Sequence, residues 1–148
     1  MFRGQSLHNL DSKKRLRIPA RFREVLKEEY QDDSQVMVTT LDKCLAAYPM
    51  PVWQAIEEKI VKLSTVNPEV RRFKRYFISG AQNCSFDKQG RILIPQYMRQ
   101  LACFDREVLL AGMLDNFEIW GKSRWEEEMD NTRYSIPDIA QKMAELGI

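Results

Sequence analysis

Residues 11–19 read Asp11-Ser12-Lys13-Lys14-Arg15-Leu16-Arg17-Ile18-Pro19, and residues 87–95 read Asp87-Lys88-Gln89-Gly90-Arg91-Ile92-Leu93-Ile94-Pro95. The second stretch lies 76 positions after the first and keeps the spacing of its Asp, Arg, Ile and Pro residues. A glycine precedes each copy, and an arginine follows each copy at the same distance, at Arg23 and Arg99. Internal repetition at a fixed offset indicates two copies of one structural module.

Each copy is predicted to form a tight turn that leads into a strand. An aspartate favours a turn because its carboxylate accepts hydrogen bonds from backbone N–H groups a few residues further on. In the second copy Gly90 stands where the turn needs a positive φ, which glycine adopts freely. Lys14 has that place in the first copy, so either the turn is altered or Lys14 is left-handed at a cost of about 1 kcal/mol. The alternation that follows places Arg15 and Arg17 together on an open face.

The remaining patterns predict the same order of elements in both halves: strand, basic turn, strand, short helix, hairpin, helix. A two-residue connection at Asp42-Lys43 predicts a hairpin, and Ser123 and Glu126 have capping-box spacing. About eight short strands without βαβ spacing favour a mostly antiparallel sheet that is closed or interleaved. Helices are expected at residues 21–30, 51–66, from Asn67-Pro68 onwards, at 123–129 and, weakly, at 135–148.

Composition places the chain among ordinary globular proteins, with 148 residues, 44% apolar and 30% charged. It contains no apolar run near the roughly 20 residues of a membrane span, and its start has no signal-peptide pattern. Charge is uneven: residues 1–25 carry a net +5 and residues 126–148 a net −4. The basic N-terminal region is consistent with binding to an anionic partner.

Residues for catalysis or metal binding are sparse. The cysteines Cys44, Cys84 and Cys103 are at least 19 residues apart, which argues against a zinc site or a disulfide framework and favours buried or half-buried thiols. His8 is the single histidine, so a metal site or a histidine-based triad lacks its parts. The phosphate-loop and dinucleotide-binding glycine motifs are absent. We therefore predict no catalytic residues, no metal and no cofactor.

The paired Asp-x-x-x-Arg-Leu/Ile-x-Ile-Pro signature behind a Met-Phe-Arg-Gly start resembles the MraZ family. Two copies at this spacing make the resemblance specific, and it extends over about residues 1–129. The family usually has glycine at the position of Lys14, so this departure concerns the first turn and not the fold. Further matching segments are Asn9-Leu10-Asp11-Ser12-Lys13, Cys44-Leu45-Ala46-Ala47-Tyr48-Pro49, Asn67-Pro68-Glu69 and Phe117-Glu118-Ile119-Trp120.

The resemblance implies a β-rich α+β fold. MraZ proteins look like double-split (swapped-hairpin) β-barrels made of two tandem AbrB-like repeats, with peripheral helices. The first repeat with its helices would span residues 1–79, and the second, with the C-terminal helices, residues 80–148. Both halves would form one compact unit.

The resemblance also implies a function. MraZ proteins are bacterial transcriptional regulators that assemble into rings of several subunits. The chain would then bind repeated DNA boxes upstream of the division and cell-wall gene cluster and repress its own operon. We expect it in the cytoplasm, at the nucleoid. Its partners would be double-stranded DNA and further copies of itself, with no membrane and no small-molecule substrate.

The basic turns are the expected DNA contacts. Arg15 is the first candidate for base readout, because arginine can bind guanine through two hydrogen bonds, with the lysines on phosphates. The family motif places Asp11 beside Arg15 and Asp87 beside Arg91. Because a carboxylate would repel DNA phosphates, the aspartates are expected to form the turns and orient the arginines. The second copy carries fewer positive charges than the first, because it has uncharged residues at Gln89, Gly90 and Leu93. The expected DNA-binding residues are Lys13, Lys14, Arg15, Arg17, Lys88 and Arg91.

Some alternatives stay open at this level. A basic run at Arg71, Arg72, Lys74 and Arg75 could be a second anion surface, although a helical charge run is more often a solvated face. Arg3 could add to the basic turn. The protein could instead be an assembly scaffold whose basic face meets an acidic protein or RNA, and an enzyme is the least supported class. Core or subunit-interface positions are expected for Trp53, Phe73, Phe77, Trp120 and Trp125.

Overall fold

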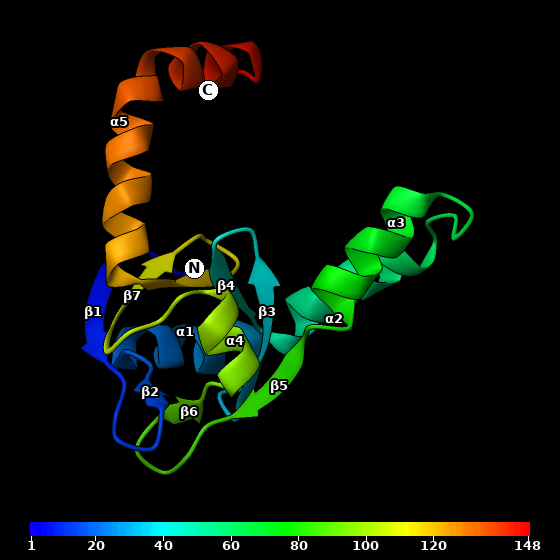
Figure 1. Cartoon of the computed structure of the whole chain (residues 1–148). Helices are drawn as coiled ribbons and strands as arrows, with labels where there is room; N and C mark the ends of the chain where they lie inside the picture. The colour runs from blue at the N-terminus through cyan, green and yellow to red at the C-terminus, as the bar shows by residue number, and fades with distance from the viewer.

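The computed structural model describes residues 1–148 as a β-rich α+β fold, as the sequence predicts (Figure 1). It contains eight strands, five α-helices and one π-helical segment, η1. The strands are β1 (Gln5–Asn9), β2 (Arg15–Arg17), β3 (Gln35–Leu41), β4 (Cys44–Tyr48), β5 (Gln82–Ser85), β6 (Arg91–Leu93), β7 (Glu107–Gly112) and β8 (Phe117–Gly121). The helices are α1 (Ala20–Tyr30), α2 (Met50–Val61), α3 (Pro68–Phe73), η1 (Lys74–Ile78), α4 (Gln96–Leu101) and α5 (Lys122–Glu145).

The sheet interleaves strands from the two halves of the chain. Its order is β1-β7-β8-β4-β3-β5, and every neighbouring pair is antiparallel. The first strand of each half therefore pairs with the hairpin of the other half: β1 with β7, and β5 with β3. Exchanging β1 with β5, β7 with β3 and β8 with β4 reproduces the order, which gives the sheet an internal twofold relationship. The predicted antiparallel, interleaved arrangement is confirmed.

Strands β2 and β6 form a separate two-stranded ribbon, with Leu16 directly opposite Ile92. Both side chains are fully buried. They belong to one cluster of 19 buried residues that draws on both halves, including Phe22 and Met98 from α1 and α4. A buried aliphatic or aromatic side chain contributes about 1.5–3 kcal/mol relative to an exposed one, so this shared core ties the ribbon to the sheet.

Helices α2, α3 and η1 form an arm that projects from the body (Figure 1). A small second core holds its base, where Trp53 lies 5.3 Å from Phe77 between ring centroids. Asn67 caps α3 by accepting a hydrogen bond from the Glu69 N–H, which the sequence predicts. One expectation is wrong here: helix α2 ends at Val61 and not at residue 66. Phe73 is 42% exposed and stacks on Phe77, so it lies outside the core, and its alternative place at a subunit interface stays a prediction.

Helix α5 also corrects the sequence interpretation. A single helix covers Lys122–Glu145, where two were expected, and Ser123 is not its cap, because Gly121 has that position. Pro137 lies inside the helix. Proline lacks the N–H and its ring crowds the carbonyl four residues earlier, which bends a helix rather than necessarily ending it. Figure 1 shows the distal part of α5 turned away from its first part. No helix of the chain is both long and apolar enough to cross a membrane.

Candidate nucleic-acid interface

Asp11 builds the first basic turn. One carboxylate oxygen accepts hydrogen bonds from the backbone N–H groups of Lys13 and Arg15, each at 2.9 Å. The other oxygen accepts from Nε of Arg15 at 2.8 Å. The Asp11 carbonyl accepts from the N–H of Lys14 at 3.0 Å and closes the turn. The carboxylate thus fixes both the turn backbone and the first arginine.

Asp87 makes the same contacts in the second turn. Its oxygens accept from the N–H groups of Gln89 and Arg91 at 2.9 Å, and from Nε of Arg91 at 2.8 Å. Because the two sets of distances agree, the turn backbones are equivalent. Lys14 has φ of 64° and Gly90 has φ of 73°, so of the two alternatives the left-handed lysine is the one found.

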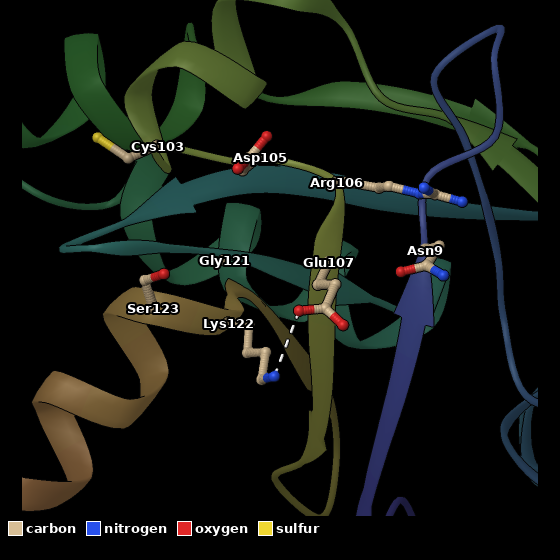
Figure 2. Close-up of a pocket in the computed structure, with 8 residues that line it drawn as sticks. All are labelled: Asn9, Cys103, Asp105, Arg106, Glu107, Gly121, Lys122 and Ser123. Carbon is tan, nitrogen blue, oxygen red and sulfur yellow. Dashed lines mark ion pairs between the residues drawn. The ribbon is translucent and has the colours of Figure 1, made fainter.

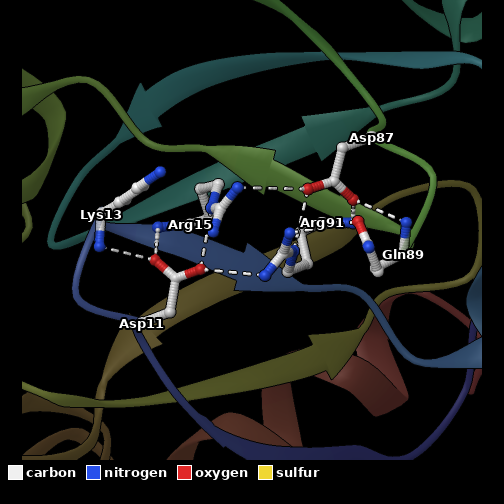
Figure 3. Close-up of polar contacts among 6 residues, drawn as sticks. All are labelled: Asp11, Lys13, Arg15, Asp87, Gln89 and Arg91. Atoms are coloured by element: carbon white, nitrogen blue, oxygen red, sulfur yellow. Dashed lines mark hydrogen bonds and ion pairs between the residues drawn. The ribbon is translucent and has the colours of Figure 1, made fainter.

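The two turns share their charges across the ribbon. Nη1 of Arg91 lies 3.3 Å from Oδ2 of Asp11, and Nη1 of Arg15 lies 3.9 Å from Oδ2 of Asp87. Together with the contacts inside each turn, these ion pairs form a closed four-membered group (Figure 3). Its arginine side chains are 30% and 21% exposed, so both are held in place yet reachable from solvent.

The pKa values of both aspartates follow from these contacts. Hydrogen bonds from the Arg15 N–H, the Arg15 guanidinium and the Lys13 N–H lower the pKa of Asp11 below its ordinary 3.8, against the opposing effect of burial. For Asp87, burial alone would raise the pKa, but hydrogen bonds from Arg91 and Gln89 outweigh it and lower the pKa. Both carboxylates are therefore charged at neutral pH.

The ribbon has an outer face, formed by the side chains of Arg15, Arg17, Arg91 and Leu93. Arg15 lies opposite Leu93, and Arg17 lies opposite Arg91. Residues directly opposite in an antiparallel pair point to the same side, and the alternate pair Leu16 and Ile92 points into the core. Four cations on this face or on the turns are exposed and take part in no ion pair: Lys13, Lys14, Arg17 and Lys88.

The second turn rests on an arginine from the first half, a role that the sequence did not suggest. The guanidinium of Arg23 lies under the second turn, where a Cβ added to Gly90 would be 2.6 Å from its Cζ. Arg99 instead lines a cleft of about 450 Å³ beside Lys14, together with Arg106. The matching spacing of Arg23 and Arg99 behind the two motifs was the available signal.

Two other basic candidates lie away from the ribbon. The run Arg71, Arg72, Lys74 and Arg75 belongs to the projecting arm (Figure 1). Arg3 lies beside Gly112, at the end of β1 remote from the turn, because β1 separates it from Asp11. The expectation that Arg3 is near the basic turn is therefore wrong.

A polar cleft of about 410 Å³ lies at the start of α5 (Figure 2). It contains an ion pair of 3.3 Å between Lys122 and Glu107, and Cys103, whose sulfur points away from that pair. His8 is elsewhere, with its Nε2 2.5 Å from Oγ of Ser6, and burial, assisted by the charges of Arg21 and Arg17, lowers its pKa below 6.5. No group of three or more His, Cys, Asp or Glu side chains is placed to hold a metal ion.

The fold and the ribbon define a class of protein: a chain of two repeats that contribute equivalent basic turns to one shared, salt-bridged ribbon. Comparison with known sequences identifies the family. The family model described as "MraZ protein, putative antitoxin-like" matches residues 1–76 and again residues 77–146. The chain belongs to the MraZ family.

Relatives match over the whole length. The chain is 50% identical to a protein of Syntrophobacter fumaroxidans over 99% of this chain and 97% of the relative. It is 43% identical to a protein of Caldicellulosiruptor bescii and 44% identical to one of Clostridium tetani, each over 100% of both chains. All three relatives carry the name "Transcriptional regulator MraZ".

Proposed function

We propose that the protein is a sequence-specific DNA-binding regulator of transcription and not an enzyme. Its main support is the group of four exposed, unpaired cations, Lys13, Lys14, Arg17 and Lys88, gathered on the turns and outer face of a single ribbon. The names of its relatives support the same role. It acts in the cytoplasm, at the nucleoid.

The ribbon enters the DNA groove with its outer face toward the bases. Two-stranded β-ribbons fit the major groove of B-DNA. Lys13, Lys14 and Lys88 at the turns contact phosphates, because lysine is a flexible point charge without a planar fork. Arg15 and Arg91 are pre-oriented by the aspartates and present their remaining N–H groups to base edges.

The protein acts as a ring of several copies on repeated DNA boxes. The arm exposes apolar side chains that a neighbouring subunit would cover, among them Val66 at 82% and Val61 at 75% exposure. A ring presents several ribbons to consecutive boxes, so avidity converts weak single contacts into tight binding. The boxes lie upstream of the division and cell-wall gene cluster, and binding represses the protein's own operon.

We also propose that the sheet and the ribbon together make the double-split barrel of the family. Its repeats are residues 1–79 and 80–148, which form one compact unit. The mutual pairing of β1 with β7 and of β5 with β3 supports this proposal, since each repeat completes the sheet of the other.

A gel-shift experiment tests the proposed function. The full-length protein is titrated against duplex DNA from upstream of its own coding sequence and against a scrambled duplex of equal composition. Preferential binding to the upstream DNA is expected, with log K falling against log salt by about 0.9 per neutralised phosphate. Equal affinity for both duplexes, or none for either, would instead favour a scaffold that binds an acidic protein or RNA.

Assembly is tested separately with Val66→Glu, which places a charge on the exposed arm. This variant is expected to lower the mass in solution and to weaken binding to DNA with several boxes far more than to a single box. Lys142→Ala on α5 is the control for a charge change away from both surfaces. If the mass of Val66→Glu in solution is unchanged, the arm does not take part in the contact between subunits.

A further inference from the structure

The outer face of the ribbon is symmetric at two positions and asymmetric at the other two. The 76-residue offset relates Arg15 to Arg91, and both are held by aspartates in the same way. The same offset relates Arg17 to Leu93. One end of the ribbon thus carries a free cation where the other end carries an apolar side chain.

Leu93 stands out on this face. It is 58% exposed, while the residues before and after it in the chain, Ile92 and Ile94, point inward and are at most 1% exposed. It lies directly opposite Arg15, so it belongs to the surface that would face DNA. Arg17 is likewise exposed and makes no ion pair.

Resting on the proposed function, we propose that Leu93 is a specificity residue that contacts the methyl group of a thymine in the major groove. At the related position Arg17 contacts a guanine. The ribbon therefore reads an asymmetric site with thymine at one end and guanine at the other, and the protein binds each box in one orientation.

The chemistry of the groove supports this assignment. The thymine C5-methyl is the apolar feature of the major groove and is recognised by apolar side chains, whereas guanine offers two acceptors to arginine. Arg15 and Arg91 are equivalent and cannot distinguish the two ends of a site. Arg17 and Leu93 are diagonal across the ribbon, about 7–8 Å apart. This separation corresponds to about two base-pair steps at 3.4 Å each.

Replacing single thymines by deoxyuridine tests the proposal, because this change removes only the methyl group. Binding duplexes are first selected by the wild-type protein from a library with a randomised core, and each thymine is then replaced in turn. We expect one position where wild-type affinity falls about fourfold, as burial of one methyl predicts. Leu93→Ala should bind the thymine and deoxyuridine forms of that position equally.

A second selection uses Leu93→Arg, which makes the two ends alike. This variant is expected to select guanine in place of that thymine. Leu146→Ala, at another exposed leucine just beyond the end of α5, is the control and should retain the fourfold effect. If wild type selects DNA but no deoxyuridine position matters, or if Leu93→Ala retains the effect, the proposal is overturned while DNA binding stands. If wild type selects no sequence, the proposed function fails and the proposal fails with it.

Discussion

Nη1 of Arg91 lies 3.3 Å from Oδ2 of Asp11, an aspartate 80 residues earlier that forms the turn of the other repeat. Each arginine therefore has two carboxylate partners, one from its own turn and one from the opposite turn. Removal of either aspartate alters both turns at once. The two repeats are expected to respond to mutation as one unit, with strong non-additivity between Asp11 and Asp87.

Acid should weaken the fold through these carboxylates. Their pKa values are lowered in the folded protein, so their stabilising contribution is fully present above the unfolded value near 3.8. It is lost as the pH falls through the lowered folded values. The free energy of unfolding, measured with urea between about pH 5 and pH 2, should fall more steeply for wild type than for Asp11→Asn/Asp87→Asn.

Asp138→Asn on distal α5 is the control for this prediction, since Asp138 takes part in no ion pair. It should follow the wild-type pH dependence. Identical slopes for the double variant and wild type would show that the shared ion pairs do not contribute to stability.

Lys14→Gly should stabilise the protein. Lys14 has φ of 64°, a conformation that costs a side-chain residue about 1–2 kcal/mol. Glycine relieves that strain but loses about 0.5–1 kcal/mol through its greater freedom in the unfolded chain. We therefore expect a net gain of up to about 1.5 kcal/mol in the free energy of unfolding, measured with urea.

Gly90→Ala is the matched variant in the second turn and should act in the opposite direction. Its φ is 73°, and a new Cβ would lie 2.6 Å from Cζ of Arg23. Strain and displacement of that guanidinium should cost at least about 1 kcal/mol. If Gly90→Ala is neutral and Lys14→Gly is destabilising, the two turns do not share a backbone conformation.

Arg15 and Lys13 should affect DNA binding in different ways. Arg15→Ala is expected to cost about 1–3 kcal/mol per base contact and to relax sequence preference. Arg15→Lys should lose most of the same binding free energy, because lysine has no planar fork with which to contact an aspartate and a base together. Lys13→Ala should weaken binding to all sequences alike and lower the salt slope by about 0.9.

These binding effects are measured by fluorescence anisotropy over a range of salt concentrations. Arg133→Ala is the control, because Arg133 forms an exposed ion pair with Asp130 on α5. A folded Arg15→Ala that binds the selected duplex as tightly as wild type would exclude Arg15 from recognition.

The cysteines should differ in reactivity. Burial raises the pKa of Cys84 to about 11, and burial together with Glu118 raises the pKa of Cys44, whereas Cys103 is exposed. Since the thiolate is the reactive form, one thiol should react rapidly with a disulfide reagent at neutral pH, and two only after unfolding. Cys103→Ser should abolish the rapid phase. Three rapid thiols would contradict the burial of Cys44 and Cys84.

Local patterns predicted much of this molecule. The alternation of Arg15, Leu16, Arg17 and Ile18 assigned their faces, and the Asp42-Lys43 connection predicted the β3–β4 hairpin. The ion pair between Arg91 and Asp11 was not predictable in the same way. It depends on which strands become neighbours, and this is decided by the packing of both halves and not by local spacing.

The predictions of helix boundaries were wrong where tertiary structure outweighed the local sequence pattern. Two helices were expected on either side of residues 130–134, yet α5 runs through that gap and bends at Pro137 without ending, because one missing hydrogen bond does not end a long helix. Phe73 has helical spacing with Phe77, but only Phe77 reaches the small core of the arm. The spacing of apolar residues identifies one face of a helix. It does not determine how many residues of that face are buried in a core.

The exchange of β1 and β5 between the repeats has a consequence for how the chain folds. Strand β1 has no partner within its own repeat, so the first repeat cannot complete its sheet before β7 is present. Pairing of residues about 100 positions apart is slow, since the intervening loop must close first. A single repeat produced alone should therefore be unstable as a monomer and should reach a folded state only by pairing with a second copy of itself. The full chain thus resembles a dimer whose two subunits are joined covalently. Because the connecting chain keeps the two repeats together, folding does not depend on protein concentration.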